Sequence, residues 1–595
     1  MKPDIALVEK AFAQYQNGDL AAAESLLSQI PHNPSALHLL GLVRVRQGRI
    51  PEALELLSSS VAAQPREAQA RFNYGKVLAA VGRHSEAKSC FQTVLAIDSQ
   101  HVEALLALGR SHHALGEFDQ AVEYYERFLQ KEPTNTSAKI VLGNMLVAAG
   151  RPGDGIAVLT AILEHTADRR LSAELHRGLT AAYRKRLDYR SALKHLEKLM
   201  NLEPSCEGLV QERAVLLESA YFFEEAKAAY EQMLEREPAE SRVHRRYNDL
   251  LYRLGDRDNF LVSYGRAPRT KELLLDKAQF LLSADAWEEA RTNFETVITR
   301  YGEDKAARLG IGLALLKGHK INEAVSVLEM ASQTYPDSVD VHCNLAGALA
   351  ELGDAPKAIE AANRALEVDP FSQPALALLG TSLRLVKEGR DEFINNYDEF
   401  VRVFDLEPPT GFPDMVTFNA ALASELSRMH PNSGPYLRQS LRGGTQTSDN
   451  LFDCDNSLLA QLRARIENAV RQYISELRED DDHPLLCRRR AEFMFSGSWS
   501  SRLHDRGFHI NHLHPGGWIS SCYYVEVPEV ASDLTAQQGW IKFGEPSFDV
   551  GLKARRMIQP LPGRLILFPS YMWHGTVPFH DSSSRMTVAF DVVPI

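Results

Sequence analysis

The sequence contains few cysteines, and none of them are paired in a motif. Six cysteines are scattered over 595 residues, and no two are separated by only two positions. This scatter argues against the disulfide framework of small secreted proteins and excludes a Cys-Xaa-Xaa-Cys metal or redox motif. Isolated thiols are typical of a reducing compartment, so we expect a cytoplasmic protein.

Long apolar runs and an excess of basic charge are also missing. No stretch approaches the roughly 18 apolar residues of a membrane span, and the start, MKPDIALVEKAF, is too polar for a signal peptide. The formal net charge of −12 argues against nucleic acid as the main partner, because phosphate binding requires surplus lysine and arginine. A chain of 595 residues is too long for one core, so several domains or a repeat array are expected.

Small residues recur with a fixed period through the first two thirds of the chain. Gly41, Gly75, Gly109 and Gly143 follow one another at intervals of 34 residues. Alanines recur twelve positions after these glycines and prolines twelve positions later again, at Ala53, Ala87, Ala121, Pro65 and Pro133. The small residues would let two helices approach closely, and the proline would end the second helix. This pattern resembles the tetratricopeptide repeat.

The repeat resemblance implies an all-α superhelix over residues 1–390. We expect about ten or eleven helical hairpins, with an irregular one near 241–270, where the period breaks. Such superhelices bind extended peptides or other proteins on their concave face. A protein or peptide is therefore the expected partner, and a purely scaffolding role is the alternative.

The sequence changes character after the repeats. Residues 391–415, with Pro408 and Pro413, are predicted to form a linker. Beyond residue 490, short runs of β-branched and aromatic residues alternate with glycine and proline, which predicts strands. Many short strands in one region favour a double-sheet jelly roll or barrel over 416–595. The segment QSLRGGTQT at 439–447 has no spacing that suggests chemistry, and we expect it to be structural.

Three histidines and an arginine lie at the ends of predicted strands, in an order that could build a metal site. His512 and His514 are two residues apart on an extended segment and should point the same way, because side chains on a strand alternate between faces. His574 follows another predicted strand and could complete a metal site. Arg585 begins a third strand and could bind an anionic co-substrate beside the metal.

The motifs HLHP at 512–515, CYYV at 522–525 and LFPS at 567–570, with His574, resemble the 2-oxoglutarate- and iron(II)-dependent oxygenases. They look most like a bacterial and phage group with His-Xaa-His, and are more distantly similar to prolyl hydroxylases. The resemblance covers roughly residues 410–595. It implies a double-stranded β-helix with flanking helices, and a hydroxylase that uses Fe(II), 2-oxoglutarate and O2 and releases succinate and CO2.

The resemblance also implies roles for individual residues. His512, His514 and His574 would bind the iron, and Arg585 would bind the far carboxylate of 2-oxoglutarate. Additional donors to that carboxylate could come from Thr587 and from one of two adjacent tyrosines, Tyr523 and Tyr524. Strand alternation allows only one tyrosine to face inward, and we favour Tyr524.

One departure from the common pattern leaves alternatives open. The usual triad has a carboxylate where this chain has His514, and an all-imidazole set also suits zinc or copper. A cupin-like metal site also uses His-Xaa-His but expects a glutamate soon after, where this chain continues PGGWIS. Asp505 could hydrogen-bond a ligand and His509 could orient the site. The alternative functions are an adaptor that binds metal without turnover, and an oxygenase of a small metabolite.

Overall fold

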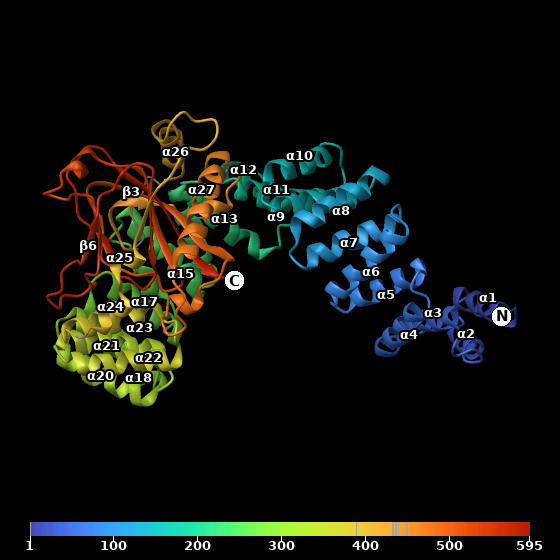
Figure 1. Cartoon of the computed structure of the whole chain (residues 1–595), viewed down its shortest axis with the longest axis horizontal. Coiled ribbons are helices and arrows are strands. Elements are labelled where there is room, and N and C mark those ends of the chain that lie inside the picture. Colours follow the sequence, from blue (N-terminus) through green and yellow to red (C-terminus); the bar gives the residue numbers. More distant parts are fainter. Residues whose placement is uncertain (1, 388, 431–433, 435–436, 438, 448–449) are drawn as a thin grey trace. The chain divides into compact units, whose positions relative to one another are not determined.

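The structure is a computed structural model that describes residues 2–387, 389–430, 434, 437, 439–447 and 450–595 (Figure 1). These residues divide into two compact units, 1–206 and 207–595, which we describe separately. Within the described part of the chain, no helix combines the length and the apolar character needed to cross a membrane.

The first unit consists of helices that pair through short turns. They are α1 (Lys2–Gln16), α2 (Leu20–Leu27), α3 (Pro34–Arg46), α4 (Ile50–Ala63), α5 (Ala68–Ala80), α6 (His84–Ile97), α7 (Val102–Ala114), α8 (Phe118–Lys131), α9 (Thr136–Ala148), α10 (Pro152–Leu163), α11 (Arg169–Lys185) and α12 (Tyr189–Leu202). The periodic glycines lie where paired helices touch. A Cβ atom at Gly41 would come within 2.7 Å of Leu57, and one at Gly143 within 2.8 Å of Leu159. The 34-residue period therefore reflects helix–helix contact.

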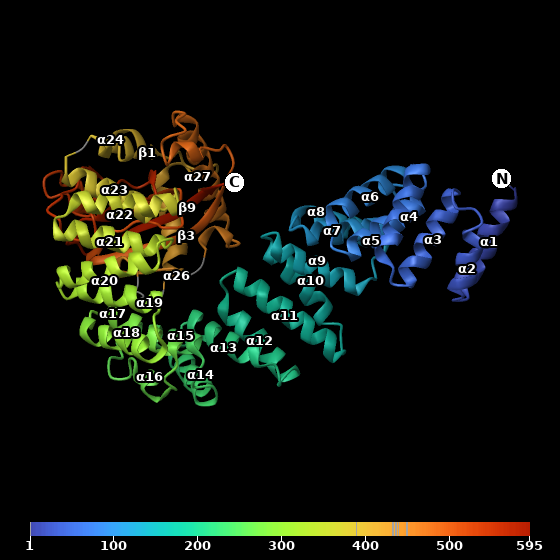
Figure 2. The same ribbon diagram turned by 90° about the horizontal axis from the view of Figure 1, so that it is seen from below.

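The second unit begins with further helices of the same kind (Figure 2). They are α13 (Glu207–Ser219), α14 (Phe223–Arg236), α15 (Ser241–Leu254), α16 (Val262–Arg266), α17 (Lys271–Ser283), α18 (Trp287–Tyr301), α19 (Lys305–Lys317), α20 (Ile321–Thr334), α21 (Val339–Leu352), α22 (Ala355–Val368) and α23 (Gln373–Leu385). The helix α16 has only 5 residues and lies in the stretch where the sequence period breaks.

The stretch suggested as a linker contains ordered elements of the next region. The helices α24 (Arg390–Ile394) and α25 (Tyr397–Phe400) precede β1 (Arg402–Asp405). Strand β1 pairs antiparallel with β7 (Arg564–Pro569) and forms one edge of the main sheet. Part of 391–415 therefore belongs to the β-rich region.

The β-rich region contains two antiparallel sheets. The six-stranded sheet has the order β1-β7-β4-β9-β3-β2, and the three-stranded sheet has the order β6-β5-β8. The remaining strands are β2 (Leu441–Gln446), β3 (Phe493–His509), β4 (Ile519–Glu526), β5 (Ile541–Phe543), β6 (Arg556–Ile558), β8 (His574–Thr576) and β9 (Arg585–Pro594). The accompanying helices are α26 (Met415–Met429) and α27 (Ser457–Glu476), with 3-10 turns at Leu451–Asp453, Leu486–Arg488 and Glu529–Ser532.

The two sheets pack on each other, since the rings of Phe543 on β5 and Phe568 on β7 lie 5.0 Å apart. A helical repeat array followed by an antiparallel β-rich region confirms the predicted fold class.

The last repeats and the sheets share one hydrophobic core. Buried residues from α21 to α23 belong to the same cluster as those of β4, β7 and β9. Hydrogen bonds from the segment between β7 and β8 reinforce this contact and a second one with α24. The Trp573 indole donates to the Thr381 hydroxyl at 3.1 Å, and the Tyr571 hydroxyl donates to the Ile394 carbonyl at 2.7 Å. The final repeats therefore support the β-rich region directly.

Candidate metal centre

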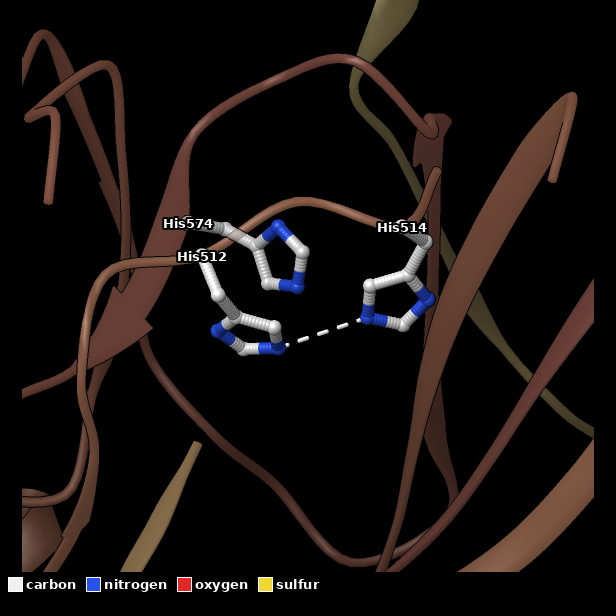
Figure 3. Close-up of side chains that lie close together, drawn as sticks. All are labelled: His512, His514 and His574. Carbon is white, nitrogen blue, oxygen red and sulfur yellow. Dashed lines mark hydrogen bonds between the residues drawn. The ribbon is translucent and has the colours of Figure 1, made fainter. Parts of the chain in front are cut away.

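Three histidines converge on one cavity within the β-rich region. His512 and His514 lie between β3 and β4, and His574 begins β8. His512 and His574 form an isolated antiparallel bridge, with reciprocal N–O distances of 2.8 and 3.0 Å. One ring nitrogen from each histidine lies within 4.8 Å of the others (Figure 3). The Nε2 atoms of His512 and His514 are 3.3 Å apart, which suits shared coordination of one ion.

The hydrogen-bond partners of the Nδ1 atoms determine which ring nitrogen of His512 and of His574 is free to bind a metal. The Nδ1 atoms of His512 and His574 lie 2.8 and 2.9 Å from the backbone carbonyls of Ile510 and Met572. A carbonyl only accepts hydrogen bonds, so each Nδ1 carries the proton and each Nε2 keeps a free lone pair. Metal-binding histidines are typically oriented in this way.

Burial keeps these imidazoles neutral. It lowers the pKa of His512 to about 4, with a further contribution from nearby His514. Burial also holds the pKa of His574 well below its ordinary value, helped by His512 and His514. A neutral imidazole is the form that binds a metal ion. The site is therefore ready to bind metal near neutral pH.

A carboxylate lies directly behind His514. The Nδ1 atom of His514 donates to Oδ1 of Asp591 on β9 at 2.6 Å, and both side chains are largely buried. Asp591 also accepts a hydrogen bond from the Ser520 hydroxyl at 2.6 Å, and Ser520 bonds Ser570 at 2.8 Å. The usual triad has a carboxylate ligand, which the three histidines lack. Here the carboxylate of Asp591 is not a member of the ligand group but is hydrogen-bonded to the histidine that would replace that ligand. Asp505, the acid that the sequence suggested for such a contact, instead lies 3.3 Å from His580 and is half exposed.

A buried cation lies in the same cavity as the histidines. The cavity measures about 260 Å³ and is lined by the three histidines, Arg585 and Thr587, among others. Arg585 is only 1% exposed, its Nε donates to the Gly539 carbonyl at 3.1 Å, and its guanidinium lies 4.9 Å from the centre of the Tyr524 ring. Neither Nη2 of Arg585 nor the Tyr524 hydroxyl has a hydrogen-bond partner among the described residues. A buried guanidinium nitrogen that lacks a partner, on a residue in the cavity lining, suits a carboxylate ligand.

The adjacent tyrosines face opposite ways. Burial raises the pKa of Tyr524 well above its ordinary value, so its hydroxyl remains a donor beside Arg585. The Tyr523 hydroxyl instead donates to Oδ1 of Asn419 on α26 at 2.7 Å. Tyr523 therefore packs between the sheet and α26, which leaves Tyr524 as the tyrosine beside Arg585. The alternation of side chains along β4 accounts for the difference.

The structure adds residues that sequence reasoning missed. Gln439, Ser440 and Gln446 come from the segment expected to be only structural, yet they line the cavity. They arrive there because β2 pairs with β3, a long-range contact with no local sequence signal. The ring of Trp499 lies 5.5 Å from that of His514. His509, which the sequence had already suggested could orient the site, is also in the lining, and its Nδ1 lies 3.2 Å from the Ser440 hydroxyl.

Comparison with protein families agrees with both regions. Residues 497–591 match the family described as "Putative 2OG-Fe(II) oxygenase", a span that includes all three histidines, Arg585 and Asp591. Residues 37–176 match the middle TPR-like domain of cilia and flagella-associated protein 70, and residues 315–382 match a tetratricopeptide repeat family. The resemblances drawn from the sequence are therefore confirmed. Comparison with the curated proteins gives no match.

Several solved structures are similar over part of the chain. The structure of Naa15/Naa10 bound to HypK-THB is 16% identical, with 71% of each chain covered and a TM-score of 0.35. YrrB, described as a TPR protein with an unusual peptide-binding site, is 16% identical, with 32% of this chain and 96% of its own covered and a TM-score of 0.29. MamA from Desulfovibrio magneticus RS-1 is 20% identical, with 29% and 97% covered and a TM-score of 0.27.

Proposed function

We propose that this protein is an iron(II)- and 2-oxoglutarate-dependent dioxygenase that hydroxylates a protein or peptide substrate in the cytoplasm. One observation carries the proposal: the three histidines and the buried Arg585 line the same cavity of the β-rich fold, and Nη2 of Arg585 has no hydrogen-bond partner among the described residues. Iron with 2-oxoglutarate would supply the oxygen-activating chemistry, with succinate and CO2 as co-products.

Residues at one end of the cavity would bind the metal, and residues at the other end would bind the co-substrate. His512, His514 and His574 would hold the metal, and Asp591 would keep His514 oriented through its Nδ1 proton. Arg585 would bind the far carboxylate of 2-oxoglutarate, with Tyr524 and Thr587 as further donors. Low exposure to water strengthens such charge-assisted hydrogen bonds.

The arginine end of the cavity argues for an oxygenase over a structural metal site. Structural zinc sites are usually closed by four protein ligands, whereas three ligands on one side leave positions for a co-substrate. The described residues around the histidines offer three ligand atoms, and a buried cation with free donors lies beside them. A site that only bound metal would not need a buried guanidinium with an unpaired Nη2 beside it.

Anaerobic reconstitution tests the proposal. The full chain is loaded with Fe(II) and 2-oxoglutarate, and the visible charge-transfer band is recorded before and after oxygen is added. We expect a weak band that decays with formation of succinate. His574→Ala should lose both signals, whereas His580→Ala, which changes an exposed histidine, should keep them. A wild-type protein that gives neither band nor succinate contradicts the proposal.

A further inference from the structure

A second, larger cavity runs along the last repeats. It measures about 830 Å³ and is lined by the first helix of four consecutive pairs, α17, α19, α21 and α23. These helices stack in order beside the β-rich region (Figure 2). Residues of the β-rich region, Pro515, Ser547 and Phe548, complete the lining at one side. We call this cavity the repeat groove.

The repeat groove adjoins the metal cavity. Pro515 lines both cavities and directly follows the proposed ligand His514. Both cavities lie within the same compact unit. A chain lying in the groove would therefore have its nearest route to the metal past Pro515.

The groove offers polar groups that suit an extended backbone. Gln373 is only 3% exposed, and its Oε1 has no hydrogen-bond partner among the described residues. Its Nε2 donates to the Phe371 carbonyl at 2.7 Å, so Oε1 remains available to accept from a ligand N–H. Asn344 adds a second amide to the lining. Between them the surface is open, since a Cβ at Gly347 would meet only Leu378, at 3.7 Å.

The acidic residues of the groove indicate that its ligand is positively charged. Asp340, Glu351 and Asp369 line it, against one lysine, Lys317. That lysine is already paired with Asp285, and Arg488, outside the lining, interacts with Asp369, so Asp340 and Glu351 are the acids left to attract a cation. An acidic lining with a free acceptor favours a ligand that carries positive charge.

We propose that the repeat groove binds an extended segment of the polypeptide substrate that contains lysine or arginine, and that the adjoining residues pass Pro515 to the metal. The hydroxylation of those residues rests on the proposed function, whereas binding in the groove does not. Apolar residues of the lining, such as Leu313 and Phe548, would contact the aliphatic parts of the segment.

Fluorescence anisotropy on the full chain tests binding alone. The probes are three fluorescein-labelled Gly/Ser peptides of equal length that carry regularly spaced lysine, glutamate or alanine. We expect the lysine peptide to bind more tightly than the other two. Combining Asp340→Asn with Glu351→Gln should weaken its binding by about five- to tenfold, from the usual range of charge-pair energies. The matched control combines Glu288→Gln with Glu323→Gln, on the exposed faces of α18 and α20.

A blocking variant separates this inference from the proposed function. Gly347→Leu should fill the open groove and abolish peptide binding, which is measured without Fe(II) or 2-oxoglutarate and so does not depend on the proposed function. Thermal melting followed by circular dichroism checks that the full chain still folds. Equal binding of all three peptides, no binding of any, or normal binding to Gly347→Leu would overturn the inference. Peptide binding without succinate formation would overturn the proposed function and leave the groove standing.

Discussion

Changing Asp591 to asparagine should weaken metal binding without unfolding the protein. Asparagine keeps the shape and an acceptor oxygen for the His514 Nδ1 proton and the Ser520 hydroxyl, which now lie 2.6 Å from Asp591 Oδ1. It removes the negative charge, and charge-assisted bonds are roughly twice as strong as neutral ones. Loss of a group that hydrogen-bonds a metal ligand typically lowers metal affinity about 10- to 100-fold. We expect a loss in that range, equivalent to about 1.4–2.8 kcal/mol.

Metal affinity is measured by anaerobic competition between the full chain and a chelator, with Fe(II) and separately with Co(II). The melting temperature of the metal-free protein shows whether the substitution disturbs the fold. Asp505→Asn is the matched control, because that acid is half exposed and pairs with His580. If Asp591→Asn binds both metals as tightly as the wild type while His574→Ala does not, the carboxylate has no role in holding the metal.

Three further predictions address the co-substrate end of the site and the effect of pH. Arg585→Gln should weaken 2-oxoglutarate binding by roughly 10- to 100-fold while metal affinity stays unchanged, as measured by titrating the charge-transfer band. Tyr524→Phe should lower 2-oxoglutarate affinity by about fivefold without destabilising the metal-free protein. Tyr523→Phe should leave that affinity intact. It should lower the free energy of unfolding by about 1 kcal/mol, because Oδ1 of Asn419 loses its hydrogen-bond donor. Equal effects of the two tyrosine changes would refute this assignment. Burial lowers the pKa of His430 from 6.5 to about 4, so the unfolded chain takes up its proton first and stability is lost as the pH falls from 6.5 towards 4. Urea titrations at several pH values, followed by tryptophan fluorescence, should show this loss in the free energy of unfolding, which is at most about 3 kcal/mol for this histidine. His430→Gln should reduce the loss. The same pH dependence in the variant and the wild type would show that His430 does not cause it.

The repeats and the metal ligands could be predicted because their signals are local or periodic. Gly41 and its successors keep one spacing because every pair of helices touches in the same way. His512 and His514 are two residues apart, and their Nε2 atoms meet at 3.3 Å although both residues lie between β3 and β4 rather than on a strand. Strand alternation could have found Asp591, which is six residues after Arg585 and so on the same face of β9, where it also lines the cavity.

Other parts of the site depend on contacts between distant segments. Gln446 reaches the cavity only because β2 pairs with β3, where it lies opposite Ser501. The four-residue strand β1 acquires its role from β7, more than a hundred residues later. Neither segment has the alternating pattern of a strand in its own sequence, so its partner determines its structure.

The core that α23 shares with the sheets limits how this protein could be divided or recombined. A fragment that began at residue 416 would lack β1, so it would expose the edge of β7 and the apolar surface that the last repeats cover. Such an unpaired edge promotes aggregation. The smallest unit that could be inherited or transplanted with the metal site therefore includes the final repeats and, with them, the repeat groove. New substrates would then be acquired by changing side chains within those repeats, whereas the earlier helices could be exchanged more freely.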